Sequence, residues 1–534
     1  MRVMRQGGGR GGGGKGGKGS KGGGGGGKGG RAGGRGGGGG AGTRAASINQ
    51  FETHFTPIFQ SRWESLKRAL ALPVDHVAWV NPFVSSDSVL GAFSPSAWQI
   101  FTHSSGCNLV ARKTIGDGES IAAGATEMPQ ADVLAAAVTT PEAAQKLTAH
   151  YALDGASPLP AVALAPRPGD RVLDLCAAPG GKSLCLAGQL FGSAFGGGDK
   201  KGRSSGISCT SSSIAAAAGE GAASSDCDAD EGAAEGSTAA IAAAAASTSP
   251  PVLASPRTLL ISNDRSAPRR ARLRRVLEEF LPRELIREPA ELPVSTWGMD
   301  AGASPAAAAK AAAAATAAGF GRGAVCVTGV DAANWGRGAN APAWSAVGFD
   351  RILVDAPCSS ERHFVHSLAE AAKANDAGWS RSRIKRDAAL QGSILRNGVR
   401  MLAVGGRLVY STCSLADEEN DGVVTKILSH KRHGAGLKLV DALGGPLAEP
   451  SIAPLLVGVS KTRCGALMLP DKSAFGPLYW AVIERLAPAG DDDGDEELVL
   501  ARGGSSDGSD ASGQSEEEGS EESDSDDEGP VDVR

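Results

Sequence analysis

The sequence predicts an α/β protein built on a mostly parallel sheet, with a small N-terminal subdomain before it and disordered tails at both ends. Three observations support this prediction. Apolar strand-like runs alternate with helical patterns from residue 167 onward, acidic or thiol side chains follow these runs, and both ends have extreme compositions. Strands that alternate with helices favour a parallel sheet covered on both faces. Ligands of such sheets bind at the carboxyl ends of the strands, so the polar side chains there should line one crevice.

Both ends and two internal stretches are compositionally biased. Residues 1–45 carry ten Lys or Arg and no acid among many glycines, whereas residues 491–534 carry 18 Asp or Glu against two Arg. Residues 192–250 and 301–319 are low-complexity stretches dominated by small residues. Such segments bury too little apolar surface to offset the entropy of ordering, so we expect disordered tails and two surface insertions. The basic head can act as a non-specific RNA clamp, or it can be a compositional expansion without function. The acidic tail can compete with RNA for basic surface, or it can simply aid solubility.

The rest of the chain divides into a flanking subdomain over 46–150 and a catalytic domain over 151–490. The subdomain begins with a pattern typical of two amphipathic helices. The second part contains five predicted strands, which cover 171–175, 257–264, a run ending near Asp331, 351–354 and 407–413. Three helices are predicted between them: one from Lys182, one over 266–281 and one that Gly405 and Gly406 end.

Composition also excludes several classes of protein. No apolar run reaches the roughly 18 residues of a membrane span, and no secretory signal is recognisable at the start. The nine cysteines are an odd number and include no C-x-x-C pair, so we expect neither a structural zinc site nor another metal centre. Free thiols in a reducing compartment fit this cysteine usage.

The stretch "LDLCAAPGGKS" at 173–183 ends like a phosphate-binding loop. That loop requires a glycine where this chain has Cys176, so a nucleoside-triphosphatase is excluded. Asp174 at a strand end, with Gly180 and Gly181 in the turn, instead suits a nucleoside cofactor that lies close to the backbone.

Two further strand ends carry an acid suited to the same cofactor. Asp264 follows the second strand and suits the ribose hydroxyls, although it lies 90 residues beyond Asp174 because the first insertion intervenes. Asp331 follows the third strand and can accept a hydrogen bond from an adenine amino group. The alternative for each acid is that it caps the following helix.

Two thiols and one acid follow the remaining strands. Asp355 and Cys358 lie in "DAPC", and Cys413 ends "YSTC". A thiolate that adds to C6 of a cytosine makes C5 nucleophilic toward a methyl donor, an acid at N3 promotes the addition, and a base later removes the C5 proton. The target base must be unstacked, and a loop or bulge of RNA allows this at low cost. The alternative is that both cysteines are small buried apolar residues.

The motifs "DLCAAPGGK", "DAPCS" and "YSTCSL" resemble those of the Sun-domain RNA cytosine-5 methyltransferases, and most of all those of the member that acts on mitochondrial small-subunit ribosomal RNA. The resemblance covers 150–190, 259–281, 324–425 and 464–486. It implies a Rossmann-like class I S-adenosylmethionine-dependent methyltransferase fold. It also implies that Cys413 is the nucleophile, that Cys358 assists elimination, and that Asp355 contacts the cytosine and the cofactor. Spacing alone does not choose between the two cysteines.

The same resemblance implies a set of cofactor contacts and partners. S-adenosylmethionine would be held by Gly180, Gly181, Lys182, Asp264, Arg269, Asp331 and Asp355, and Lys182 can also reach the target base. The implied substrate is small-subunit ribosomal RNA, the implied compartment is the mitochondrion, and a protein partner can supply RNA specificity. The Gly-rich head also resembles nucleolar tails, so the nucleolus and the chloroplast stay open. The basic cluster at 381–390 can contact phosphates or be merely solvated.

Two alternatives to ribosomal RNA methylation remain. One is a ribosome-assembly factor that binds RNA and cofactor without needing turnover, although such a scaffold has no use for two thiols at strand ends. The other keeps the chemistry and changes the substrate to transfer RNA or DNA.

Overall fold

The computed structural model describes residues 39–84, 89–94, 97–104, 107–112, 137–140, 143–195, 257–291, 323–335, 348–369 and 379–488. The expected acidic tail, the insertion over 301–319, and most of the Gly-rich head and of the first insertion lie outside the described residues. Helices α1 (Gly39–Phe59) and α5 (Gly181–Phe195) each extend a few residues into stretches that the sequence assigns to the head and to the first insertion.

The main sheet has ten strands, and its centre consists of the five strands that the sequence predicts. In spatial order these are parallel to one another: β12 (Leu402–Thr412), β11 (Phe349–Asp355), β7 (Arg171–Asp174), β8 (Leu259–Asn263) and β10 (Ala324–Thr328). The parallel β9 (Ile286–Arg287) lies beyond β10. Antiparallel strands extend the other edge: β16 (Leu478–Arg485), β13 (Leu437–Val440), β15 (Ala466–Met468) and β14 (Ser460–Lys461). The prediction of a mostly parallel α/β sheet is confirmed.

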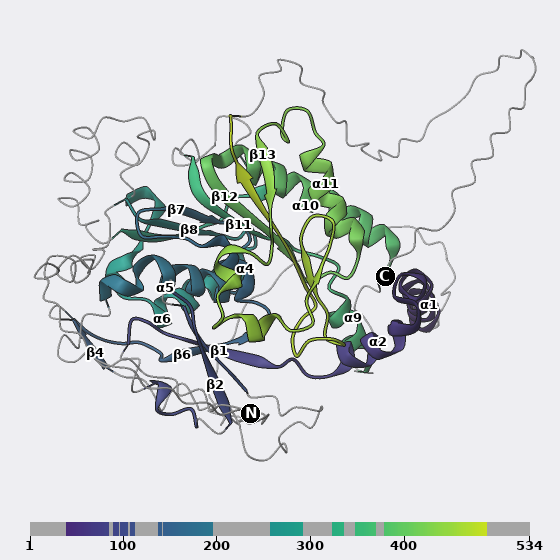
Figure 1. The fold of residues 1–534 in the computed structure, drawn as a ribbon, viewed down its shortest axis with the longest axis horizontal. Coiled ribbons are helices and arrows are strands. Elements are labelled where there is room, and N and C mark those ends of the chain that lie inside the picture. Colours follow the sequence, from purple (N-terminus) through teal and green to yellow (C-terminus); the bar gives the residue numbers. More distant parts are fainter. Residues whose placement is uncertain are drawn as a thin grey trace, which may run out of the picture. The chain divides into compact units, whose positions relative to one another are not determined.

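Helices cover both faces of this sheet (Figure 1). Successive strand residues point to opposite faces. Val172 and Val409 accordingly belong to one core cluster, and their neighbours Leu173 and Tyr410 belong to the other. The first core includes residues of α4 (Leu159–Leu164), α5 and α6 (Ala267–Phe280). The second includes residues of α10 (Arg381–Met401) and α11 (Asp421–Leu428).

The predicted end of the helix before β12 is wrong. Helix α10 ends at Met401 and β12 begins at Leu402, so Gly405 and Gly406 lie inside the strand. The register between β11 and β12 shifts at this point, and Gly405 has a φ of 79°, which favours glycine. The two glycines therefore form a bulge at the start of β12 and not the helix stop that their sequence predicts.

The predicted amphipathic helix pair is present as α1 and α2 (Trp63–Ala71). Its aromatic side chains Phe51, Phe55 and Trp63 are buried, and Phe51 packs on Phe364 and Trp379 with ring centroids 4.9 and 5.2 Å apart. Phe364 lies on α9 (Glu361–Ala369), four residues after Ser360 and six after Cys358. The helix pair thus packs directly on the part of the catalytic domain that bears the candidate thiols.

A second sheet belongs to the N-terminal region and has the order β2 (Trp98–Thr102), β3 (Asn108–Arg112), β1 (His76–Val80) and β6 (His150–Asp154). Strand β6 begins at His150, so the expected domain boundary after residue 150 falls within this strand. Asn81 donates to the carbonyl of Phe280 on α6 over 2.9 Å, which ties this sheet to the catalytic domain. A separate hairpin pairs β4 (Ala137–Thr140) with β5 (Ala143–Lys146).

Short 3₁₀ helices complete the described structure: η1 (Gln60–Arg62), η2 (Arg283–Leu285), η3 (Pro289–Glu291), η5 (Ala332–Asn334), η7 (Asp417–Glu419), η8 (Gly445–Ala448) and η9 (Ala453–Leu456). None of the helices in the described stretches is long and apolar enough to cross a membrane.

Candidate functional site

The polar residues that the sequence singles out lie at one edge of the main sheet. Asp174 and Asp355 end β7 and β11, which are neighbours, and Cys413 follows β12 on the other side of β11. The chain runs from β7 outward through β8 to β10 and then returns to β11, so the strand order reverses between β7 and β11. A reversal of this kind opens a ligand-binding crevice at the carboxyl ends of the two strands.

The turn after β7 packs closely on α6. Gly180 has a φ of 121°, and a Cβ added there would lie 3.0 Å from Val276. Asp174 is fully buried and accepts a 2.8 Å hydrogen bond from the Ser183 hydroxyl through Oδ2, while its Oδ1 has no partner within the described chain. Burial raises the pKa of Asp174 to about 7, and the bond from Ser183 only partly opposes this. This buried oxygen is left without a hydrogen-bond donor in the described chain.

Asp174 is expected to make the stability of the protein depend on pH. Its pKa is higher in the folded chain than the ordinary value of 3.8, so its contribution to folding is complete below about pH 4 and is lost as the pH rises through about 7. Urea unfolding should show the loss of about 2–4 kcal/mol over this interval, and Asp174→Asn should flatten that part of the profile. An unchanged profile in the variant would mean that other groups cause the dependence.

Asp264 and Arg269 face each other at the next strand end. Asp264 Oδ1 accepts from the amide of Ser266, and its Oδ2 lies 3.3 Å from Arg269 Nη2. Arg269 also donates to the carbonyl of Ala178 over 2.8 Å, which links this pair to the turn after β7. Local capping therefore uses one oxygen of Asp264 and leaves the other at the crevice.

Asp331 is engaged in its own turn. It is the N-cap of η5, where Oδ1 accepts from the amide of Ala333 over 3.1 Å. Its Oδ2 accepts from Asn334 and Arg265 over 3.0 and 3.3 Å. The capping alternative raised by the sequence thus describes the local geometry of Asp331, although its side chain stays one-third exposed.

The two thiols lie next to each other. The Sγ atoms of Cys358 and Cys413 are 3.0 Å apart, although 55 residues separate them in the chain. The hydrogen bond to Cys413 and then burial raise the pKa of the Cys358 thiol well above its usual range. Cys358 therefore stays protonated at neutral pH and can act as a proton donor toward its neighbour.

Asp355 and Lys182 form an ion pair beside the thiols. Lys182 Nζ lies 2.9 Å from Asp355 Oδ2 and donates to the Ser157 hydroxyl over 2.9 Å, while Asp355 Oδ1 accepts from Ser411 over 2.8 Å. Burial alone would lower the pKa of Lys182, but the neighbouring Asp355 raises it by more. Lys182 is therefore a cation at neutral pH. Ser411, two residues before Cys413 on the adjacent strand, holds the Asp355 carboxylate by its hydrogen bond.

Two buried carboxylates, which the sequence analysis missed, hold the thiol-bearing loops together. Glu361 accepts from the Ser359 hydroxyl, the Trp379 indole and the amide of Leu415, so it bridges the loops after Cys358 and after Cys413. Glu419 accepts from the amide of Ser359 over 3.0 Å, and burial, followed by the charge of Glu361, raises its pKa to about 7. In the sequence these residues are two ordinary acids in polar stretches, because their partners are distant in the chain.

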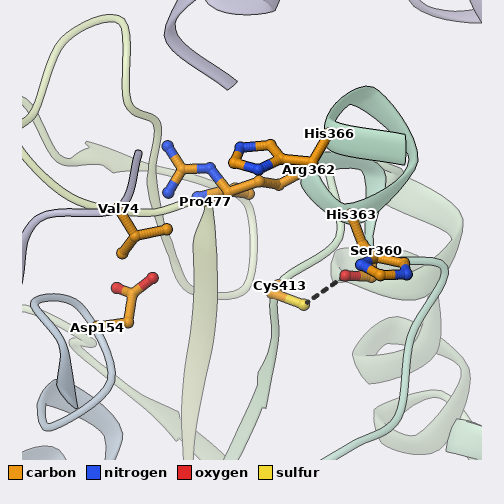
Figure 2. A pocket seen from close by; sticks show the side chains of 8 residues that line it. All are labelled: Val74, Asp154, Ser360, Arg362, His363, His366, Cys413 and Pro477. Carbon is orange, nitrogen blue, oxygen red and sulfur yellow. Dashed lines mark hydrogen bonds between the residues drawn. The ribbon is translucent and has the colours of Figure 1, made fainter. Parts of the chain in front are cut away.

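A pocket of about 290 Å³ opens beside Cys413 (Figure 2). Figure 2 shows the Cys413 thiol between Asp154 on one side and α9 residues on the other. The lining residues are Val74, Asp154, Ser360, Arg362, His363, His366, Cys413 and Pro477. Burial raises the pKa of Asp154 and lowers that of Arg362. The pocket thus offers an acid and a cation within reach of the thiol.

The α2 helix holds two of the lining side chains in place, and Val74, just after α2, lines the pocket itself. Arg362 donates to the carbonyl of Ala69 over 3.2 Å, and His366 Nε2 lies 2.9 Å from the carbonyl of Leu70. The sequence analysis named none of the polar lining residues except Cys413. The one signal available was the density of basic residues in "SSERHFVH", directly after Cys358.

Comparison with known proteins gives a consistent set of relatives. A family model described as 16S rRNA methyltransferase RsmB/F matches residues 323–447, which include Asp355 and both candidate thiols. The mitochondrial tRNA (cytosine(34)-C(5))-methyltransferase of Mus musculus is 26% identical over 340 residues, which are 64% of this chain and 64% of that protein. The 5-cytosine rRNA methyltransferase NSUN4 of Xenopus tropicalis is 27% identical over 346 residues, which are 64% of this chain and 57% of the relative.

The chain therefore spans less than two thirds of the length of these two relatives. One similar solved structure is described as a methyltransferase homolog protein from Pyrococcus horikoshii. It is 17% identical, with a TM-score of 0.44, and the match covers 83% of this chain and 99% of that one.

Proposed function

We propose that the chain is a member of the Sun-domain RNA cytosine-5 methyltransferase family and that it methylates C5 of a cytosine in RNA with S-adenosylmethionine as the methyl donor. The observation that carries the proposal is the 3.0 Å contact between Cys358 and Cys413 next to the Lys182–Asp355 ion pair. A protein that only binds RNA has no need of two adjacent thiols and a carboxyl group at neighbouring strand ends.

The crevice at the carboxyl ends of β7 and β8 fits a nucleoside cofactor. Gly180 has a φ of 121°, which favours glycine, the buried Oδ1 of Asp174 accepts no hydrogen bond within the described chain, and the second oxygen of Asp264 faces Arg269. We propose that Gly180, Gly181, Lys182, Asp264, Arg269, Asp331 and Asp355 hold S-adenosylmethionine there. When bound, this cofactor supplies an electrophilic methyl group.

The proposed reaction uses the protein's own groups as follows. The thiolate of Cys413 adds to C6 of the cytosine, and N3 takes up a proton from a solvent molecule that the Asp355 carboxylate positions; N3 gives this proton back when the C6–S bond later breaks. C5 becomes nucleophilic as a result. After methylation the C5 proton passes to a base, the C6–S bond breaks, and the electron pair of that bond returns to Cys413. Cys358, which remains a thiol, donates a hydrogen bond to the departing thiolate and so assists the release of the RNA.

We propose small-subunit ribosomal RNA as the substrate, the mitochondrion as the compartment, and a protein partner as a source of RNA specificity. The rRNA methyltransferase relatives support the first of these, and the mitochondrial tRNA methyltransferase relative supports the second. That tRNA relative also makes transfer RNA a second candidate substrate.

The direct test is methyl transfer from S-adenosylmethionine with a labelled methyl group, followed by nucleoside analysis of the RNA. Small-subunit ribosomal RNA, transfer RNA and DNA are offered separately and in competition. Label in 5-methylcytidine of the ribosomal RNA is the expected result. Label in transfer RNA alone would change the substrate, and binding of RNA without label in any nucleic acid would support the assembly-factor alternative.

A further inference from the structure

Helix α10 carries an unbalanced positive charge. Its 21 residues include one acid, Asp387, which lies 3.4 Å from Arg383 and 3.5 Å from Arg386. The helix has four further cations for which no ion pair exists within the described stretches of the chain: Arg381, Lys385, Arg396 and Arg400.

These four cations share one face of the helix. At 100° per residue they fall within an arc of about 100°, and at 1.5 Å per residue they span about 28 Å. Arg381, Lys385 and Arg400 are exposed and Arg396 is half-buried. Ile384 and Leu395, on another side of α10, are buried in the protein. The cationic face is thus the outer face of a helix that packs on the sheet beside α11 (Figure 1).

Small residues separate the two ends of this face. Ala389, Gly392 and Ser393 lie between Lys385 and Arg396, and a Cβ added at Gly392 would meet no atom within 4 Å. Glycine weakens a helix, and Gly392 has no packing reason for lacking a side chain. The middle of the face is therefore open to close approach by a long ligand.

The charge continues beyond the helix. The turn after α11 contains His430, Lys431 and His433, and the rings of the two histidines lie 4.4 Å apart. Burial lowers the pKa of His433 to about 4, and the charges of His430, Arg396 and Arg400 add to this effect. His433 is therefore uncharged at neutral pH, and the positive charge of this region comes from Arg396, Arg400 and Lys431.

Helix α10 is also fixed to the candidate active site. Gln391, on its buried side, donates to the carbonyl of Pro357 over 2.9 Å and to Glu419 over 2.7 Å. Pro357 directly precedes Cys358. A ligand held on the outer face of α10 would thus be held in a constant position relative to the thiol pair.

Like charges four residues apart, such as Arg381 with Lys385 and Arg396 with Arg400, destabilise an isolated helix, as does a cation in its first turn. A polyanion that covers the face would remove this repulsion. We propose that the cationic face of α10 binds the sugar–phosphate backbone of the RNA that carries the target cytosine. The inference rests on the proposed function for the identity of the polyanion. Contacts of this kind position a nucleic acid without reading its sequence.

The test measures RNA affinity by fluorescence anisotropy at several salt concentrations, with a labelled fragment of small-subunit ribosomal RNA. Gly392→Glu places an acid in the open middle of the face, and glutamate forms helix better than glycine, so the fold should persist. We expect this variant to bind RNA about 5- to 10-fold more weakly, whereas Gly392→Gln should bind like the wild type. Arg275→Gln on α6, a helix of the opposite face, changes the net charge equally and should also have no effect.

Removal of two cations provides an independent measurement. The double variant Lys385→Ala/Arg396→Ala should lower the slope of log affinity against log salt by about two and leave S-adenosylmethionine affinity unchanged. The inference is overturned if Gly392→Glu and Lys385→Ala/Arg396→Ala both bind RNA with the wild-type affinity and the wild-type salt dependence, even if methyl transfer occurs. A wild-type protein that binds RNA through this face without transferring methyl groups would instead contradict the proposed function.

Discussion

Replacing Cys413 with alanine is expected to slow methyl transfer to RNA by at least about a thousand-fold, because the covalent step that activates C5 is then lost. Replacing Cys358 should have a different signature. Without the neighbouring thiol, release of the methylated base is impaired, and a protein–RNA adduct that survives a denaturing gel should accumulate in the presence of S-adenosylmethionine. The 3.0 Å contact between the two Sγ atoms is the reason to expect that the two roles depend on each other.

Cys326→Ala is the matched control for this experiment. Cys326 is a free cysteine that is buried within β10 and does not contact the thiol pair, so its removal should leave both the rate and the gel unchanged. If the protein–RNA adduct accumulates with Cys413→Ala and not with Cys358→Ala, Cys358 is the nucleophile and Cys413 assists release. The absence of an adduct from every form, on RNA shown to bind, would favour the assembly-factor alternative.

Asp355→Asn is expected to lower methyl transfer by about a hundred- to ten-thousand-fold, since the carboxylate is the group that can position a proton at N3. The variant should also lose stability, because it leaves the ammonium of Lys182 without its partner at 2.9 Å. Removal of one member of a buried ion pair costs about 3–5 kcal/mol of folding free energy. The cost should be smaller here, because the side chain of Asp355 is 30% exposed. Methyl-transfer kinetics at saturating cofactor and urea unfolding measure the two effects separately.

Asp350→Asn separates these effects further. Asp350 lies at the opposite end of β11 and forms an ion pair with Arg171 at 3.2 Å. Its substitution makes the same chemical change on the same strand, so it should reduce stability without lowering the rate per folded molecule. If Asp350→Asn lowered the rate as much as Asp355→Asn, the loss would come from disruption of β11 and not from the absence of a carboxylate at N3 of the cytosine.

The sequence alone was sufficient to predict the architecture and the edge of the sheet at which the candidate reacting groups lie. The five central strands, the parallel sheet and the placement of Asp174, Asp355 and Cys413 at its carboxyl edge followed from local patterns: an apolar run, then an acid or a thiol, then a helical period. These signals are contained within about ten residues, so no knowledge of distant contacts was needed to find them.

The tertiary structure decided which groups surround the reacting atoms. Arg362 and His366 meet carbonyl groups of α2 nearly 300 residues away in the chain, and Glu361 and Glu419 join two loops more than 50 residues apart. Each of these side chains is an ordinary charged residue in its local stretch of sequence. Their burial and their partners, which shift the pKa values of Arg362 and Glu419, arise only when helices and loops from distant parts of the chain pack together.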